Sequence, residues 1–338
     1  MPRRSLAEVI PEEMPLAGYL LARALQDRKV DGEDFERLRR ANDSVREVRA
    51  LLPFGRGNMR EDIRASRGES STRTKGGRDL RRDPVHAPED VAAIWAGAGN
   101  CGEHARLCTR AHAARLDSQS GESVIHYHNA QVDHSWVEAL VPRSFNPTIY
   151  RWKPEPRDIV LDAWKDGPAV FGPDSTSTWS DWERARTIRH WSYQPQGLST
   201  AKALAQNLAR THDPRDSAPY ITPEWSVWDA EPVVGKAFLA NASQKPVPAT
   251  AVWLRVHHMV PQPKRLLAAM PSEIRRQILA VGIARELMAP PAPQIESTHR
   301  GRGRVRTATN QARDIVDAMK NLRHPAPRGG APAPGAEI

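Results

Sequence analysis

The sequence predicts an α+β fold, because helical and strand patterns occupy separate stretches of its 338 residues. Two helical patterns lie near the N-terminus, and a third begins at a cysteine further along the chain. Three segments with strand character follow, and only "QVD" separates the first two, which is typical of a hairpin. We therefore expect a helix that begins at the cysteine, followed along the chain by an antiparallel hairpin, with added helical segments at both ends.

The N-terminal helical patterns lie within residues 11–52. They read "PLAGYLLARALQDRKV" and "EDFERLRRANDSVREVRALL", and the intervening "DGED" supplies a turn followed by an acidic helix start. We expect a helical hairpin in a first region of residues 1–54.

The next region, residues 55–86, carries many arginines, frequent Gly and Ser, and almost no large apolar side chain. Such a segment buries too little surface to offset the entropy lost on ordering. We predict a disordered basic linker here.

The central part of the chain combines helices with strands. "APEDVAAIWAGAGN" predicts a short helix that stops at glycines, and a second helix is expected from Cys101 to about Leu116. The three strand segments that follow are 123–130, 134–141 and 158–164.

Beyond Asp166 the sequence is rich in Pro and Trp and predicts irregular structure before the next helix. Helical patterns then cover 199–211, 264–270, 272–288 and 307–322, with a strand at 250–260. Residues 290–306 predict a basic loop, and residues 323–338 a disordered tail.

Composition limits the classes of protein that the chain could belong to. The net charge is +9, but 40 acidic residues are interspersed among 49 basic ones, so we expect no nucleic-acid partner. No stretch has the roughly 20 apolar residues of a membrane span, and the start "MPRRSLAEVI" resembles neither a secretory signal nor a myristoylation site. The two cysteines would lie about 10 Å apart on one helix, which predicts free thiols in a reducing compartment.

Cys101 is the candidate nucleophile, because a helix start favours the thiolate form of a cysteine. It stands in "GAGNCGEHARLC", where glycines allow a substrate to approach the backbone closely. Strand alternation places His134, Trp136 and Glu138 on one face of "HSWVEAL", and Asp162 can reach His134 if the next strand is its neighbour. Cys108 is expected to be a buried core residue.

Several further residues are candidates around this cysteine. Asn100, Gly102, Trp95 and Trp136 could form an oxyanion hole or line the cleft, with simple packing as the alternative for both tryptophans. Asp158 and Asp166 remain alternatives to Asp162 as the third member of a triad.

Histidines gather near the same motifs. His126, His128 and His134 could mark a metal site together with Glu103 or His104, but no carboxylate stands at a firm ligand spacing. We therefore predict no metal, and we expect His104 to pack or to line the cleft.

Three motifs together, "GNCGEHA", "DHSWVE" and "IVLDAWKDGPAV", resemble the HopX family of type III secreted effectors, also called AvrPphE or XopE. The order Cys, His, Asp is that of the transglutaminase-like, papain-related superfamily. The resemblance implies a Cys-bearing helix packed on a small antiparallel sheet, within a catalytic domain at 87–322 whose core is 87–180. It makes Cys101 the nucleophile, His134 the general base and acid, and Asp162 the orienting carboxylate, with no metal or organic cofactor.

The resemblance also implies a function. We expect a protease, deamidase or transglutaminase that acts on host proteins in a plant cell and alters immunity. The first 54 residues would then hold a secretion signal and a site for a secretion chaperone, and the protein would act in the host cytoplasm or nucleus. The alternative is a non-enzymatic basic adaptor that binds host proteins or nucleic acid through its arginine-rich segments.

Overall fold

We describe the protein from a computed structural model, which describes residues 14–28, 30, 32–82, 86–142, 155–177, 179–216 and 218–244. Several predictions lie outside these residues: the secretion signal at the extreme N-terminus, the strand at 250–260, the helices at 264–270, 272–288 and 307–322, the basic loop at 290–306, and the tail at 323–338.

The centre of the fold is a five-stranded antiparallel sheet with the order β6-β5-β4-β3-β7. Its strands are β3 (Ser123–Asn129), β4 (His134–Leu140), β5 (Ile159–Leu161), β6 (Val170–Phe171) and β7 (Arg186–Trp191). Helices surround this small sheet, so the predicted α+β class is confirmed. The hairpin of β3 and β4 is also confirmed, whereas the third predicted strand is shorter than 158–164.

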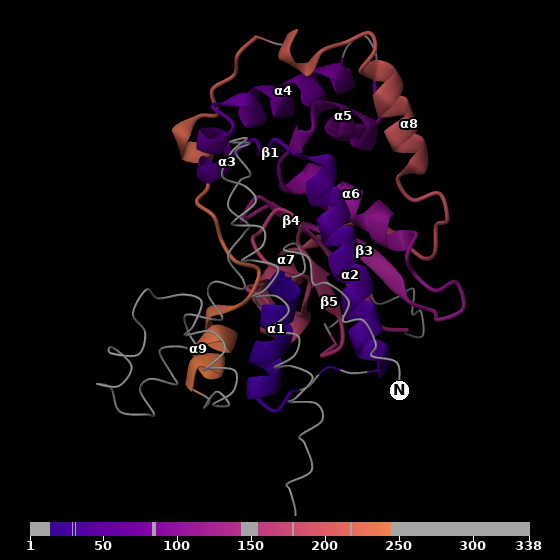
Figure 1. Cartoon of the computed structure of the whole chain (residues 1–338), viewed down its shortest axis with the longest axis vertical. Coiled ribbons are helices and arrows are strands. Elements are labelled where there is room, and N and C mark those ends of the chain that lie inside the picture. Colours follow the sequence, from indigo (N-terminus) through magenta and orange to yellow (C-terminus); the bar gives the residue numbers. More distant parts are fainter. Residues whose placement is uncertain are drawn as a thin grey trace, which may run out of the picture.

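Helix α6 (Cys101–Ala113) packs against β3 and β4, and helix α2 (Gly32–Leu51) packs along α6. Figure 1 shows these two helices side by side, with α1 (Met14–Leu25) below them. One continuous core joins side chains of the N-terminal helices, of α6 and of the sheet, including Leu38, Val45, Leu107, Val137 and Leu161. The predicted helical hairpin therefore shares its core with the sheet.

The segment predicted as a disordered linker is ordered over residues 55–82, so that prediction is wrong there. It forms β1 (Gly55–Arg56), α3 (Arg60–Ala65) and α4 (Glu69–Arg82). β1 pairs in parallel with β2 (Ala98–Gly99), and α4 packs on α5 (Glu89–Ala96). This region therefore lies directly beside the start of α6.

Small side chains and paired arginines explain why this polar segment folds. A Cβ on Gly77 would lie only 3.1 Å from Ala92 O, so α4 approaches α5 more closely than a larger residue would allow. The guanidinium of Arg73 lies 3.6 Å from the ring centroid of Phe54. Close helix contact and the ion pairs of Arg73 with Glu69 and of Arg78 with Glu103 replace the large apolar residues whose absence suggested disorder.

The chain after β5 is more regular than the sequence predicts. Besides β6, it contains the 3₁₀ turn η2 (Gly172–Asp174), α7 (Trp179–Arg184) and the edge strand β7, which replace the predicted irregular segment. β7 is mostly exposed, so no alternation of apolar and polar residues marks it in the sequence.

The predicted helix at 199–211 is confirmed as α8 (Ser199–Leu208), which packs on α5. Two short turns, η3 (Pro214–Asp216) and η4 (Glu224–Ser226), and the unpredicted helix α9 (Lys236–Gln244) follow it. Among the described residues, no helix combines the length and the apolar character needed to cross a membrane.

Candidate active site

Cys101 is the first residue of α6, as predicted, and its side chain is partly exposed. The preceding helix α5 ends at Gly97, whose φ of 66° is left-handed backbone that favours glycine. The Cys101 Sγ lies 3.7 Å from the carbonyl oxygen of Asp133, the residue before His134. The start of α6 is thereby brought next to the start of β4.

The turn before the cysteine is held by Glu103. Its Oε2 accepts a hydrogen bond of 2.8 Å from the backbone N–H of Asn100, the N-cap residue of α6. A Cβ on Gly99 would lie 2.6 Å from the Glu103 Cβ, so glycine is required there. In contrast, a Cβ on Gly102 would meet no atom within 4 Å. The α-carbon of Gly102 therefore faces open space beside the thiol.

His134 and Asp162 form the central pair of the site, with 2.7 Å between His134 Nε2 and Asp162 Oδ2. The register pairs Val137 with Leu161, so Asp162 follows β5 on the face that carries His134. The other oxygen of Asp162 accepts the backbone N–H groups of Trp164 and Lys165, at 3.1 and 3.0 Å. Both carboxylate oxygens are thus engaged, and the imidazole is held by a fixed partner.

Arg49 of α2 supports the loop that carries Asp162. Its buried guanidinium donates to the carbonyl oxygens of residues 162, 163, 165 and 167. The N-terminal helices therefore contribute directly to the position of the carboxylate.

The pair is strongly coupled in charge. Burial by itself would lower the pKa of His134, but the charge and hydrogen bond of Asp162, together with Cys101, raise that pKa above its usual value. Burial likewise opposes ionisation of Asp162, but the charge and hydrogen bond of His134 outweigh it and lower the pKa of the carboxyl. The arrangement favours a charged imidazolium against an ionised carboxylate.

Two tryptophans flank the imidazole. The ring of Trp136 lies nearly parallel to that of His134, with centroids 6.1 Å apart, which agrees with its predicted place beside the histidine. Trp164 lies closer, with a centroid distance of 5.1 Å, and was not among the predicted site residues. Its position two residues after Asp162, on the same strand face, was the signal that could have identified it.

The structure separates Asp162 from the two alternative carboxylates. Asp158 accepts backbone N–H groups from Val141 and Glu155, at 3.1 and 2.6 Å. Asp166 lies 2.9 Å from Arg56 Nη1. Among the described contacts, only Asp162 joins His134.

Trp95 has the packing role that was the alternative to a place in the cleft. It packs beside Leu80, Ala92 and Leu208, and its indole N–H donates to His212 O at 3.2 Å. These contacts join α5 to α4, to α8 and to the residues that follow α8, and they engage the indole N–H of Trp95 away from the oxyanion hole.

His104 lies buried one turn after Cys101. Its Nδ1 is 2.9 Å from the carbonyl oxygen of Asn100. Burial lowers its pKa to about 4, so the ring is neutral near pH 7 and donates this N–H. It packs behind the first turn of α6, as expected.

Cys108 is fully buried and burial raises the pKa of its thiol, in agreement with its predicted place in the core.

The three histidines that were weighed as a metal site, and set aside, do not converge. His126 is paired in register with Val137, which puts it on the opposite sheet face from His134, and His128 Nδ1 is 3.0 Å from Ser135 Oγ. In the part of the chain that the structure describes, no three His, Cys, Asp or Glu residues are arranged to hold a metal ion.

Sequence reasoning missed Arg78 of α4. Its Nε and Nη2 lie 2.9 and 3.1 Å from the two oxygens of Glu103, and its charge interacts with Cys101. This bidentate pair fixes the carboxylate that caps α6. Small residues spaced along one helix face, Ser70, Thr74 and Gly77, were the available signal of packing.

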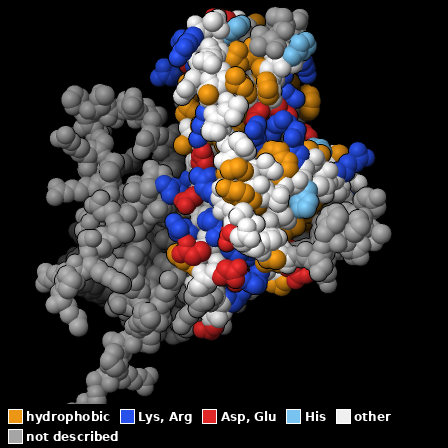
Figure 2. Space-filling model, turned by 90° about the vertical axis from the view of Figure 1, so that its right-hand side faces the viewer, with side chains coloured by type: hydrophobic (Ala, Val, Ile, Leu, Met, Phe, Trp, Pro, Cys, Tyr) orange, Lys and Arg blue, Asp and Glu red, His pale blue; other side chains and the backbone are white. Residues whose placement is uncertain are grey.

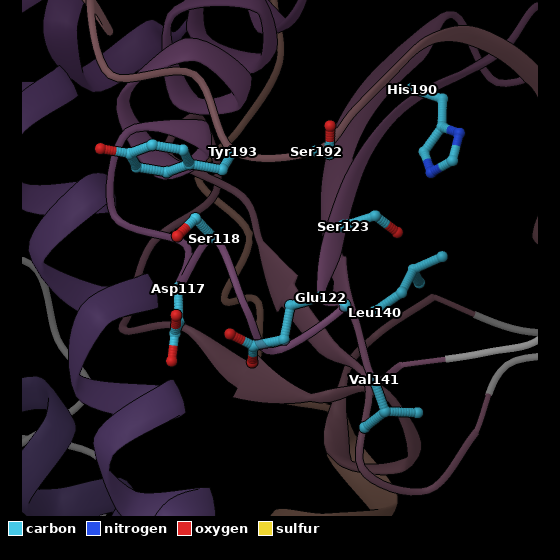
Figure 3. A pocket seen from close by; sticks show the side chains of 10 residues that line it. Asp117, Ser118, Glu122, Ser123, Leu140, Val141, His190, Ser192 and Tyr193 are labelled. Carbon is cyan, nitrogen blue, oxygen red and sulfur yellow. The ribbon is translucent and has the colours of Figure 1, made fainter.

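A depression with a volume of about 560 Å³ lies at the other end of the sheet from His134. Figure 3 shows Asp117, Glu122, His190 and Tyr193 among the side chains around it. It adjoins Leu140, at the far end of β4, which is about 20 Å from His134 at 3.3 Å per residue. Glu122 is already paired with Arg37 and Arg40. This depression does not belong to the Cys101 site.

No family model matches the chain, and no curated protein or solved structure matches it either.

Proposed function

We propose that the protein is a cysteine-dependent acyl-transfer enzyme with Cys101, His134 and Asp162 as its triad. The observation that carries the proposal is the position of His134, which is hydrogen-bonded to Asp162 and directly follows Asp133, whose carbonyl oxygen lies 3.7 Å from the Cys101 sulfur. A nucleophilic thiol, a base beside it and a carboxylate that orients the base are the three parts that such catalysis requires.

The proposed reaction begins with attack of the Cys101 thiolate on a carboxamide or peptide carbonyl carbon. Because Nε2 of His134 is bound to Asp162, Nδ1 is the ring nitrogen that exchanges a proton with the thiol. The first N–H groups of a helix have no partner within it, so those of Cys101 and Gly102 would hold the oxyanion. The imidazolium then protonates the leaving amine, and a thioester remains on Cys101.

The second step decides the product. Attack by water on the thioester releases a carboxylic acid, which amounts to proteolysis of a peptide bond or deamidation of a side-chain amide. Attack by an amine gives a cross-link. His134 removes the proton from either nucleophile and returns it to the departing thiolate.

We further propose that the core is transglutaminase-like and that the chain is a HopX-type effector delivered by type III secretion into a plant cell. The support is the resemblance of "GNCGEHA", "DHSWVE" and "IVLDAWKDGPAV" to that family, together with a Cys-bearing helix that packs on an antiparallel sheet. The substrates would be host proteins.

The test compares host protein extracts exposed to wild type, to Cys101→Ala and to Cys108→Ala, by quantitative mass spectrometry. We expect cleaved, deamidated or cross-linked peptides with wild type and with Cys108→Ala, and none with Cys101→Ala. Equal modification by wild type and Cys101→Ala would refute the enzyme. If no peptide is modified and folded Cys101→Ala keeps the full effect on host cells, the adaptor hypothesis replaces it.

A further inference from the structure

A cluster of arginines lies on the other side of α6 from the thiol. Figure 2 shows Lys and Arg side chains interspersed with acidic ones over one face of the molecule. The cluster, which we call the arginine corner, comprises Arg106 and Arg110 of α6 and Arg189 of the edge strand β7. His126 of β3 lies beneath these arginines and is the cross-strand partner of Arg189.

The arginine corner holds more positive charge than its carboxylates neutralise. Arg106 lies 2.6 Å from Glu89, which also pairs with Arg81 at 3.3 Å, and Arg110 pairs with Asp90. Among the described residues, no carboxylate forms an ion pair with Arg189. With the neighbouring Arg81 counted, four arginines share two carboxylates, which leaves an excess of two positive charges.

The arginines are close enough to repel one another. The guanidinium carbons of Arg110 and Arg189 approach the same ring, at 5.9 and 5.7 Å from the Trp191 centroid. The pKa of Arg110 is lowered mainly by burial and to a smaller extent by the charge of Arg189. The charge of Arg189 also acts to lower the pKa of Arg106. An anion bound among these guanidinium groups would relieve their repulsion.

His126 supplies an independent observation. Its side chain is only 6% exposed, and within the described structure neither ring nitrogen has a hydrogen-bond partner. A buried polar group without a partner costs free energy, and a ligand that accepts a hydrogen bond from the ring would remove that cost. The β-bulge between His126 and Tyr127 lies at the same point, and bulges often redirect side chains beside sites.

The arginine corner is separate from the thiol. At about 100° per residue, Arg106 and Arg110 lie about 140° and 180° around α6 from Cys101. A ligand bound there would not contact the sulfur, so this inference does not depend on the proposed reaction.

We propose that the arginine corner binds a phosphate group, with Arg106, Arg110 and Arg189 as its charged donors and His126 as a neutral donor. The planar fork of a guanidinium matches the oxygens of a phosphate, and three such forks suit an ion with several acceptor oxygens and two negative charges. The ligand is either a free inorganic phosphate or a small phosphate ester.

The test uses the full chain and thermal unfolding at constant ionic strength. Inorganic pyrophosphate, inorganic phosphate and glucose 6-phosphate are titrated separately, with sodium chloride as the screening control. We expect a saturable rise in Tm with at least one phosphate compound and none with chloride. Stronger binding of the ester identifies an ester site, and stronger binding of the inorganic ions identifies a free-anion site.

Variants then locate the binding. Arg189→Gln should raise the dissociation constant at least tenfold. Because the substitution relieves repulsion between arginines, it should not lower Tm in the absence of the anion. His126→Leu should weaken binding severalfold. Arg184→Gln is the matched control on α7: it removes the same charge from an exposed side chain outside the arginine corner and should change the constant less than twofold.

The proposal is overturned if no phosphate compound raises Tm beyond the chloride control. It is equally overturned if Arg189→Gln binds like wild type, or if Arg184→Gln loses as much affinity as Arg189→Gln.

Discussion

The first turn of α6 and its middle carry the two cysteines of the chain in opposite surroundings. Cys101 is partly exposed, beside a histidine and a carboxylate, whereas Cys108 is completely buried. The two thiols are seven residues apart on one helix. The chemical reactivity of each thiol is therefore set by the elements that pack against its turn of the helix, because the residue type is the same at both positions.

The histidines repeat this lesson. Burial lowers the pKa of His104, His112 and His126, to about 4, 3 and 4 respectively. His134 is also largely buried, but its pKa is raised, because Asp162 lies within hydrogen-bond distance. Asp162, with a smaller contribution from Cys101, reverses the effect of burial.

The largest effect should come from Asp162→Asn, which removes that carboxylate. We expect the rate of substrate modification to fall about ten-thousandfold, because an amide no longer stabilises the imidazolium. The measurement is the modification rate of a substrate identified by the comparison with Cys101→Ala. Asp166→Asn is the matched control, since Asp166 pairs with Arg56 and not with His134. A loss of less than tenfold in Asp162→Asn would remove Asp162 from the triad.

The alkylation rates of the two thiols in the native protein should differ by the next largest factor. Iodoacetamide near pH 7 should label Cys101 at least about a thousandfold faster than Cys108, because Cys108 reacts only after the fold opens. Peptide mapping by mass spectrometry at several times gives the two rates. In guanidinium chloride the rates should converge, and similar rates in the native protein would contradict the comparison.

The pH dependence of stability should report the pair of His134 and Asp162. A raised histidine pKa stabilises the fold below the unfolded value of about 6.5, and this contribution is lost as pH rises through the folded-state pKa. The lowered pKa of Asp162 also stabilises the fold, but with the reverse pH dependence. Its contribution is present above about pH 4 and is lost at lower pH.

Wild type should therefore exceed Asp162→Asn in free energy of unfolding by about 3 kcal/mol between pH 5 and 6.5, with a smaller difference on either side. Urea unfolding across pH 3 to 10 measures this difference. A difference that is constant with pH would show that the two groups are not coupled.

Serine substitutions should then separate stability from reactivity. Cys108→Ser buries a hydroxyl in the core and should cost about 2 kcal/mol of unfolding free energy, without abolishing substrate modification. Cys101→Ser should change stability by less than about 0.5 kcal/mol and should abolish the thiol-dependent reaction. Urea unfolding of both variants checks this, and an equal loss of stability would contradict it.

The smallest effect should come from Arg78→Gln, which removes the partner of Glu103. Because Arg78 is partly exposed, we expect a cost of about 1 kcal/mol and a severalfold slower alkylation of Cys101. Lys75→Gln on the same helix is the control, since its pair with Asp79 lies at the surface. An unchanged alkylation rate in Arg78→Gln would limit Arg78 to a structural role.

Much of the central fold was predictable, because its elements have clear periodicity. The helices that became α1, α2, α5, α6 and α8 and the hairpin of β3 and β4 all followed from such patterns. The segment of α3 and α4 did not, because its burial depends on the close approach of small residues to α5. The edge strand β7 was also not predicted, because its side chains are largely exposed and show no alternating pattern.

The candidate site was predictable only in part. Cys101, His134 and Asp162 could be nominated, but three carboxylates competed for one role, and the register of β4 with β5 decided among them. The packing role of Trp95 could not be predicted, because its partners Leu208 and His212 lie more than 100 residues away in the chain. Arg78 was missed because the segment that carries it was expected to be disordered.

The sequence by itself determined the properties that depend on neighbours along the chain. These are a cysteine at a helix start and the common strand face of His134, Trp136 and Glu138. Only the tertiary structure decided which groups meet through space: Asp162 with His134, Arg78 with Glu103, and Arg189 with the arginines of α6. The physical reason is that backbone geometry sets local periodicity within a few residues, whereas charge coupling depends on distances between segments that only the packed core brings together.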